Sequence, residues 1–214
     1  MKKKKPLFIT IEGGEGSGKT TQSLFLKEYF EQKGYEVLLT REPGGTGLAE
    51  TIRRILLTSN LNIVPLSELF LYEAARAQHI KEVVLPALRS GKAIICDRFT
   101  DSTVAYQCYG RKLDLNLINK LNLAASFGLT PTLTIYLDIT PAKGLLNKAK
   151  GINKKSYGEI GDRFERESIQ FHNNVREGYL SQAEKYPNRI KIVKTQKRPE
   201  HTQILMRKIV DMVL

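Results

Sequence analysis

Short apolar runs alternate with amphipathic stretches along the chain. Five runs rich in aliphatic and β-branched residues occur, in order, at Leu7 to Ile11, Glu36 to Thr40, Ala93 to Cys96, Thr132 to Leu137 and Ile190 to Val193. Each has the length of a strand and is followed by a stretch whose apolar residues have helical spacing. Continuous apolar strands separated by helices are typical of a parallel sheet covered on both faces. We therefore predict an α/β fold with a five-stranded parallel sheet flanked by helices.

The same spacing predicts where the helices lie and which way they face. The longest is expected from Ser67 to Ser90, capped by Ser67 and kinked near Pro86. Other helices are expected over Asn116 to Phe127 with Leu117 and Leu121 inward, from Pro141 until it breaks down at Asn147, over Asp162 to Lys185, and at the C-terminus with Leu205, Ile209 and Val213 inward. No repeat or Pro/Gly/Ser-rich linker divides the chain, so residues 1–214 are predicted to form a single domain.

A glycine-rich segment, Gly13 to Thr21, directly follows the first predicted strand and reads GGEGSGKTT. Gly13, four further residues and then Gly18-Lys19-Thr20 have the spacing of a phosphate-binding loop in its strand-loop-helix context. Glycines let the backbone N–H groups turn inward and the anion approach closely, and the following helix adds its N-terminal dipole. We expect Lys19 to reach the β- and γ-phosphates of a bound nucleotide and the Thr20 hydroxyl to hold Mg²⁺. The predicted nucleotide-binding residues are Gly13, Gly14, Glu15, Gly16, Ser17, Gly18, Lys19, Thr20 and Thr21.

Polar residues follow the second and third predicted strands, at the edge of the sheet where ligands bind in open α/β folds. The sequence REPGGT, residues 41–46, makes a turn there, and Arg53 lies on the helix that Thr46 begins. The third strand ends in Asp97 and Arg98. An Asp at this place suits Mg²⁺, and the planar guanidinium of Arg98 can grip a phosphate at two points.

Two pairs of residues have a spacing that puts both members on one face of a helix. Tyr72 and Arg76 share one side of the long helix, where an aromatic plane and a fork of donors could stack on a nucleobase and bond its exocyclic oxygen. Thr103 and Tyr106 share a face in the segment after Arg98. A core aromatic residue beside a surface arginine remains the simpler alternative for the first pair.

A basic segment at about residues 145–160 contains Lys148, Lys150, Lys154 and Lys155 and few large apolar side chains. Low apolar content predicts few anchoring contacts, so we expect a small mobile lid that closes over the triphosphate. An ordinary solvated loop is the alternative.

Composition narrows the class further. The 214 residues are 41% hydrophobic and 26% charged, within the range of soluble globular proteins, but the formal net charge of +12 favours polyanionic ligands. Cys96 and Cys108 have neither metal-site nor disulfide-framework spacing, which fits a reducing cytoplasm. The apolar run behind the lysines at residues 2–5 is too short for a secretory signal, and no stretch approaches the ~18 apolar residues of a membrane span. We expect a cytoplasmic protein with no membrane partner.

Taken together, these motifs resemble bacterial thymidylate kinases, in the P-loop nucleoside monophosphate kinase family, over nearly the whole chain. The resemblance rests on EGGEGSGKTT, TREPGGT, YEAARAQH, CDRFTDSTVAYQ and GDRFERE with the following NNVREGYL. Several nucleotide kinases share the phosphate loop and a following Asp-Arg, whereas REPGGT together with DRFTDSTVAYQ is far more restrictive. The resemblance implies a three-layer P-loop NTPase-type fold, phosphorylation of dTMP to dTDP with ATP and Mg²⁺, a homodimer and no nucleic-acid partner.

The resemblance also implies a role for individual residues. For dTMP it implies that Glu15 contacts the 3′-hydroxyl, Arg98 and Arg53 hold the 5′-phosphate, Tyr72 stacks on thymine, Arg76 donates to thymine O4, Thr103 contacts the base and Tyr106 crowds the 2′ position. Asp97 matches the acidic residue near Mg²⁺, and Lys19 and Arg98 are implied to be catalytic.

One departure from the family pattern concerns the lid. Members whose phosphate loop lacks a basic residue, as in Glu15-Gly16-Ser17, usually supply lid arginines to the transferring group, and this chain offers lysines, of which Lys148 and Lys150 are the catalytic candidates. Lysine lacks the bidentate fork of arginine. Three alternatives stay open: a kinase for another nucleotide or nucleoside, a nucleic-acid-binding ATPase or switch, and an inactive homologue that binds nucleotide without transfer.

Overall fold

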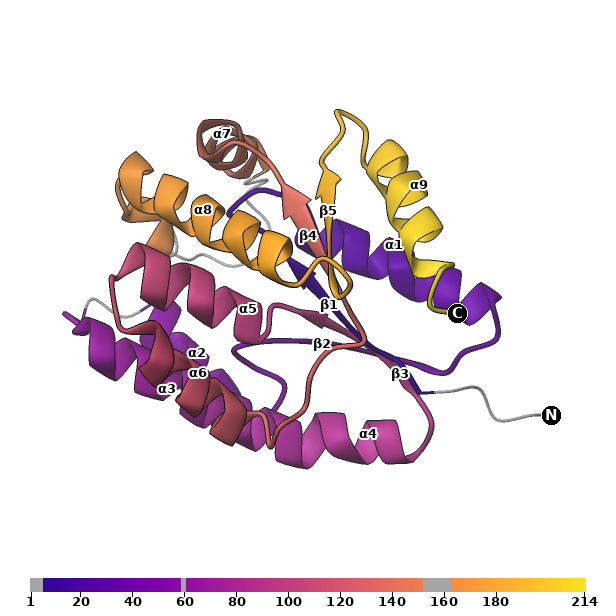
Figure 1. Ribbon diagram of the computed structural model, residues 1–214, viewed down its shortest axis with the longest axis horizontal. Helices are drawn as coiled ribbons and strands as arrows, with labels where there is room; N and C mark the ends of the chain where they lie inside the picture. Colours follow the sequence, from indigo (N-terminus) through magenta and orange to yellow (C-terminus); the bar gives the residue numbers. More distant parts are fainter. Residues whose placement is uncertain (1–5, 59–60, 152–162) are drawn as a thin grey trace.

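The computed structural model describes residues 6–58, 61–151 and 163–214, and its centre is a five-stranded sheet (Figure 1). The strands are β1 (Phe8–Glu12), β2 (Val37–Arg41), β3 (Ala93–Asp97), β4 (Leu133–Asp138) and β5 (Ile190–Lys194). They are ordered β2-β3-β1-β4-β5 and every neighbouring pair is parallel. The predicted parallel sheet is therefore confirmed.

Each strand runs one residue further at its carboxyl end than its apolar run. The added residues are Glu12, Arg41, Asp97, Asp138 and Lys194. Strand pairing is made by backbone groups, so it continues past the last apolar side chain. The consequence is a row of charged residues along the edge where the phosphate loop lies.

Helices cover both faces of the sheet. They are α1 (Lys19–Gln32), α2 (Gly47–Thr58), α3 (Pro65–His79), η1 (Ile80–Val84), α4 (Leu85–Arg89), α5 (Thr100–Thr103), η2 (Val104–Gly110), α6 (Leu115–Ala125), α7 (Pro141–Gly151), η3 (Arg163–Arg166), α8 (Ile169–Lys185) and α9 (Pro199–Val210). On one face of the sheet, α1 and α9 lie together (Figure 1). There Leu26 and Phe30 of α1 and Met206 of α9 pack in a single core with the strands. The other face is covered by η1, α4, η2 and α8. No helix within these residues is long and apolar enough to cross a membrane.

Several predicted helix boundaries are wrong. The long helix begins at Pro65 rather than Ser67, because a proline with its fixed φ suits the first helical position and needs no N–H partner there. Its C-terminal part passes through the π-helical stretch η1 just before Pro86, which cannot donate to the carbonyl four residues back. The helix after Pro141 continues to Gly151 instead of breaking at Asn147.

The predicted helix from Asp162 is in fact two elements. The short 3₁₀ helix η3 precedes α8, and the Ser168 hydroxyl caps α8 by accepting from Phe171 N at 3.1 Å.

Two helices face the core with only part of the predicted stripe. At the C-terminus, Ile209 and Val213 pack against the core as predicted, but Met206 and Val210 of α9 are the fully buried residues and Leu205 is exposed. In α6, Leu121 packs against a buried cluster as predicted, whereas Ile118 is buried and Leu117 is exposed. Consecutive apolar residues leave the phase of a helix undetermined, and contact with the rest of the protein selects it.

Candidate active site

The phosphate loop connects β1 to α1 and depends on glycine at particular positions. Gly13, Gly16 and Gly18 have φ of 153°, 63° and 88°, values that residues other than glycine rarely adopt. The Lys19 ammonium group donates to the carbonyl oxygens of Gly13 at 3.0 Å and Gly14 at 3.1 Å. Burial, with the nearby Arg98 charge, lowers the pKa of Lys19 to about 8. The lysine is thus held against the loop, at the start of α1.

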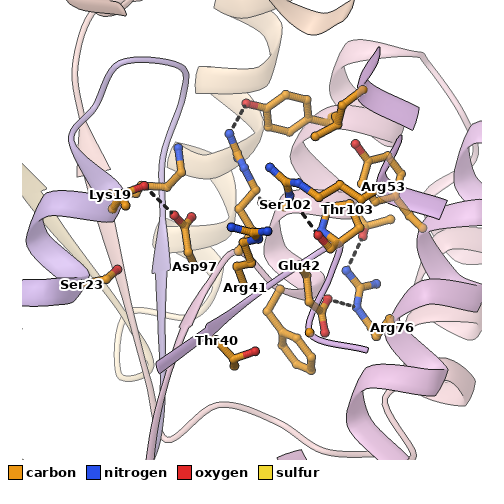
Figure 2. Close-up of a pocket in the computed structure, with 18 of the residues that line it drawn as sticks. Lys19, Ser23, Thr40, Arg41, Glu42, Arg53, Arg76, Asp97, Ser102 and Thr103 are labelled. Atoms are coloured by element: carbon orange, nitrogen blue, oxygen red, sulfur yellow. Dashed lines mark hydrogen bonds and ion pairs between the residues drawn. The ribbon is translucent and has the colours of Figure 1, made fainter. Parts of the chain in front are cut away.

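A cavity of about 540 Å³ opens beside this loop, at the carboxyl edge of the sheet (Figure 2). All seven residues that the sequence assigned to dTMP line it: Glu15, Arg53, Tyr72, Arg76, Arg98, Thr103 and Tyr106. Lys19, Thr20, Asp97 and Lys148 line the same cavity. Residues from five separate parts of the chain therefore meet at one place.

Thr20 and Asp97, the predicted Mg²⁺ pair, are adjacent. The Thr20 hydroxyl donates to Asp97 Oδ2 at 3.3 Å. Within the described ranges no three His, Cys, Asp or Glu residues form a group that could hold a metal ion. A hydroxyl and one carboxylate nevertheless fit Mg²⁺, which takes few protein oxygens and completes its octahedron with water and substrate phosphates.

Glu15 is surrounded by cationic and hydroxyl donors. Its Oε1 accepts from Arg98 Nη2 at 2.8 Å and from the Tyr106 hydroxyl at 3.1 Å, and its Oε2 accepts from Lys148 Nζ at 3.0 Å. Burial opposes ionisation, but the charges of Arg98, Lys19 and Lys148 outweigh it and hold the pKa of Glu15 well below its ordinary value. The phosphate loop therefore presents a carboxylate that is fixed in place and ionised.

Arg98 adopts an unusual backbone conformation, with φ of 71° in the left-handed region. Its Nη1 donates to Gly13 O at 3.1 Å, its Nη2 donates to the Tyr106 hydroxyl at 3.1 Å, and its guanidinium carbon lies 4.9 Å from the centre of the Tyr106 ring. The side chain is thereby directed from the end of β3 toward the phosphate loop.

At the other end of the cavity, Arg76 lies in a closed polar network (Figure 2). It is 2% exposed. Its Nε donates to Glu42 Oε2 at 2.7 Å, its Nη1 to Glu73 Oε1 at 2.9 Å and Asn122 Oδ1 at 2.7 Å, and its Nη2 to Thr103 Oγ1 at 3.0 Å. These bonds use four of the five N–H groups of the guanidinium. The fifth, on Nη2, is the one available to a ligand.

The predicted lid begins as helix α7, which lies against the phosphate loop. A Cβ on Gly144 would come 2.3 Å from the carbonyl oxygen of Glu15, a distance that only glycine permits. One turn later on α7, Lys148 forms an ion pair with Glu165 as well as with Glu15. Burial opposes the charge of Lys148, but the carboxylates of Glu15 and Glu165 outweigh it and raise the pKa of Lys148. Lys150 is exposed and does not line the cavity, and Lys154 and Lys155 lie outside the described residues.

The sequence did not single out several residues that complete the site. Glu42, Glu73 and Asn122 surround Arg76, and Glu12, Ser102 and Tyr179 lie behind Arg98. Glu42 stood inside REPGGT and Ser102 inside DRFTDSTVAYQ, so those motifs contained a signal. Tyr179 likewise stood inside NNVREGYL, whereas Asn122 had no such signal, because its helix read only as a packing element.

A parallel sheet whose first strand leads into this loop, with an Asp-Arg pair at the end of β3, defines a P-loop nucleotide-binding protein of the nucleotide kinase class. A family model described as thymidylate kinase matches residues 11–204. The chain belongs to the thymidylate kinase family, as the resemblance of its motifs predicted.

Individual relatives agree with this assignment. The thymidylate kinase of Gloeobacter violaceus is 47% identical over 208 residues, covering 97% of this chain and 96% of the relative, and that of Geotalea daltonii is 53% identical over 187 residues, covering 87% of each. The crystal structure of thymidylate kinase from Ehrlichia chaffeensis matches with a TM-score of 0.78 and 33% identity, covering 97% of this chain and 99% of that one.

Proposed function

We propose that this protein transfers the γ-phosphoryl group of ATP to the 5′-phosphate of dTMP, giving ADP and dTDP. The observation that carries the proposal is the single cavity of about 540 Å³ lined by all seven residues assigned to dTMP together with Lys19, Thr20 and Asp97. Family membership supports the same activity. A donor site and an acceptor site in one cavity are what direct phosphoryl transfer requires.

Charge neutralisation and positioning carry the chemistry in this proposal. The acceptor is a phosphate that is ionised near neutral pH, so no strong general base is needed. Lys19 binds the β- and γ-phosphates, Arg98 and Arg53 bind the 5′-phosphate of dTMP, and Lys148 supplies positive charge from α7. Thr20 and Asp97 would hold Mg²⁺, which neutralises phosphate charge when bound. Residues 1–214 act as one kinase domain with a lid at about 145–160, of which 152–160 lie outside the described residues.

Recognition of the nucleoside follows from the available donors and acceptors. The contacts of Glu15 use three of about four carboxylate lone-pair sites, which leaves one for the 3′-hydroxyl. The remaining N–H of Arg76 meets the O4 acceptor of thymine, whereas the N4 amino group of cytosine would place a donor against a donor. Tyr72 stacks on the base, Thr103 contacts it, and Tyr106 occupies the space beside the 2′ position.

An acceptor panel tests this function. ADP release is measured with dTMP, dUMP, UMP, CMP and thymidine as acceptors at equal concentrations, with ATP and Mg²⁺ present. The fastest turnover is expected with dTMP, and little with thymidine, which lacks the phosphate that Arg98 and Arg53 bind. Equal rates with UMP would contradict the role of Tyr106. ADP release that needs no acceptor and rises with added DNA would favour the nucleic-acid-dependent ATPase.

We further propose that the protein is a homodimer in the cytoplasm. Leu66 and Phe70 on α3 are 42% and 51% exposed, although large apolar side chains on a helix usually face a partner surface. A dimer would bury this side of α3, and Phe70→Glu is expected to give monomers in analytical ultracentrifugation. The cytoplasmic location is supported by Cys96 and Cys108, which are free thiols.

A further inference from the structure

Glu12, the last residue of β1, is a carboxylate at the centre of the sheet with no accessible surface. Its position is directly before the phosphate loop, yet it does not line the cavity and has no role in the chemistry proposed above. A buried charge is costly unless it is fully hydrogen-bonded. The contacts of Glu12 therefore indicate what it does.

One oxygen of Glu12 fixes the backbone after β3. Its Oε1 accepts from the Phe99 N–H at 2.7 Å. Phe99 directly follows Arg98, whose φ of 71° is disfavoured for a residue with a Cβ. A charged acceptor on the next N–H stabilises this local conformation and so the direction in which the Arg98 side chain leaves the chain.

The other oxygen orients two hydroxyl groups. Its Oε2 accepts from Ser102 Oγ at 2.6 Å and from the Tyr179 hydroxyl at 2.9 Å. The two hydroxyl oxygens also lie 2.8 Å apart. When both hydroxyl hydrogens are directed at Glu12, each oxygen keeps lone pairs for a further donor. Arg98 Nη1 donates to these same oxygens, at 3.4 Å for Ser102 and 3.3 Å for Tyr179. When ionised, Glu12 thus makes both hydroxyls acceptors for the guanidinium.

We propose that Glu12 is a positioning residue for phosphoryl transfer: through the Phe99 N–H and the hydroxyls of Ser102 and Tyr179 it holds the Arg98 guanidinium where the acceptor phosphate binds. This inference rests on the proposed function for its kinetic consequence. The position of Arg98 itself does not depend on which substrate is used. Glu12 acts from behind the arginine and does not touch the reacting atoms.

The test compares isosteric variants of the full chain. Glu12→Gln keeps the size of the side chain and one acceptor for the Phe99 N–H, but it no longer draws both hydroxyl hydrogens. Glu28→Gln makes the same change on an exposed residue of α1 and is the matched control. We expect Glu12→Gln to lower kcat/KM for dTMP by about tenfold or more, since hydrogen bonds to charged groups are strong, and to leave KM for ATP within about twofold. An equal rise in KM for dTMP and for ATP, or an unchanged kcat/KM for dTMP, would overturn the proposal.

A double-mutant cycle with Tyr179→Phe separates positioning from general damage to the fold. If Glu12 acts on Arg98 through the Tyr179 hydroxyl, the two losses in kcat/KM for dTMP will not multiply in the double variant. Independent, multiplying losses would contradict the relay.

A crystal structure of Glu12→Gln tests the inference apart from the reaction. Loss of the Arg98 contact with Gly13 O is expected, whatever the substrate of the wild-type protein proves to be. An Arg98 side chain in its present place would reject the positioning role, whereas failure of the wild-type protein to phosphorylate dTMP would reject only the proposed function.

Discussion

At the phosphate-loop end of the cavity, Lys19, Arg98 and Lys148 gather around one carboxylate, Glu15. At the other end, one guanidinium, that of Arg76, pairs with the carboxylate of Glu42 (Figure 2) and with that of Glu73. The first end has an excess of positive charge and side chains that are partly exposed, at 19% for Arg98 and 31% for Lys148. The second is closed to solvent.

The difference matches the two chemical tasks of a kinase. Phosphates carry charge that must be neutralised as it moves during transfer, so cations that can adjust are useful there. A neutral base offers only hydrogen-bonding groups, and a rigid network with one unused donor discriminates between bases at low entropic cost. Variants at the two ends should therefore fail in different ways.

The largest effect is expected at the closed end. Arg76→Met leaves Glu42 and Glu73 facing each other without their cation, which should lower the free energy of unfolding by about 3–5 kcal/mol. Urea denaturation measures the loss. Burial already raises the pKa of Glu73, so the deficit should shrink at low pH, where that carboxyl takes up a proton. A free energy of unfolding close to that of the wild type would mean that the ion pairs of Arg76 do not stabilise the closed end of the cavity.

At the phosphate-loop end, Lys19→Ala should instead abolish turnover while the protein stays folded. Loss of a group that stabilises transferring charge lowers kcat by about 10²–10³-fold. Steady-state ADP release measures the rate, and circular dichroism with a thermal melt checks the fold. Wild-type activity in the purified variant would refute the phosphate-loop assignment.

Glu12 shares features of both ends. It is buried like the network around Arg76, and it bonds the hydroxyls of Ser102 and Tyr179 that contact Arg98, the arginine proposed to bind phosphate. Burial, with the charge of Asp101, raises its pKa to about 7 from 4.5, against the opposing effects of Ser102, Arg98 and Tyr179. Lys19 and Arg189 also lie within electrostatic range. A carboxyl whose folded pKa is raised contributes stability below its unfolded pKa and loses it as pH rises through 7.

Glu12→Gln removes this titration. The wild type loses stability as Glu12 ionises between pH 4.5 and pH 8, and the variant does not. The free energy of unfolding of the variant relative to wild type should therefore rise by up to about 3 kcal/mol over this range, while its activity on dTMP falls. Urea denaturation at the two pH values measures the change, with Glu28→Gln as the control. A variant that is less stable at pH 8 than at pH 4.5, relative to wild type, would show that the carboxylate serves the fold rather than Arg98.

The smallest effect is expected on α7. Lys148→Ala should lower kcat by about tenfold, because a partly exposed lysine supplies a modest share of the charge neutralisation. Lys150→Ala should cost less, since Lys150 does not line the cavity, and the exposed Lys143 on the same helix provides a control. Equal losses at Lys148 and Lys150 would mean that the lid rearranges when ATP binds.

Much of the fold and of the cavity could be predicted because their signals are local. The apolar runs specified five parallel strands, and the spacing from Gly13 to Thr20 specified a phosphate loop. Parallel strands bring their carboxyl ends to one edge, so Asp97 and Arg98 had to lie near that loop. The motifs around Tyr72 and Thr103 then supplied the acceptor residues that line the cavity.

Other features were decided only by tertiary contact. The inward faces of α6 and α9, the burial of Asn122 against Arg76 and the left-handed backbone of Arg98 depend on residues far apart in the chain. In the sequence Glu12 was the first residue of EGGEGSGKTT, directly after an apolar strand, and nothing in that motif indicated its contacts. The role proposed for Glu12 depends on its donors Phe99, Ser102 and Tyr179, which lie up to 167 residues away in the chain. Only the tertiary structure brings these donors to the buried carboxylate.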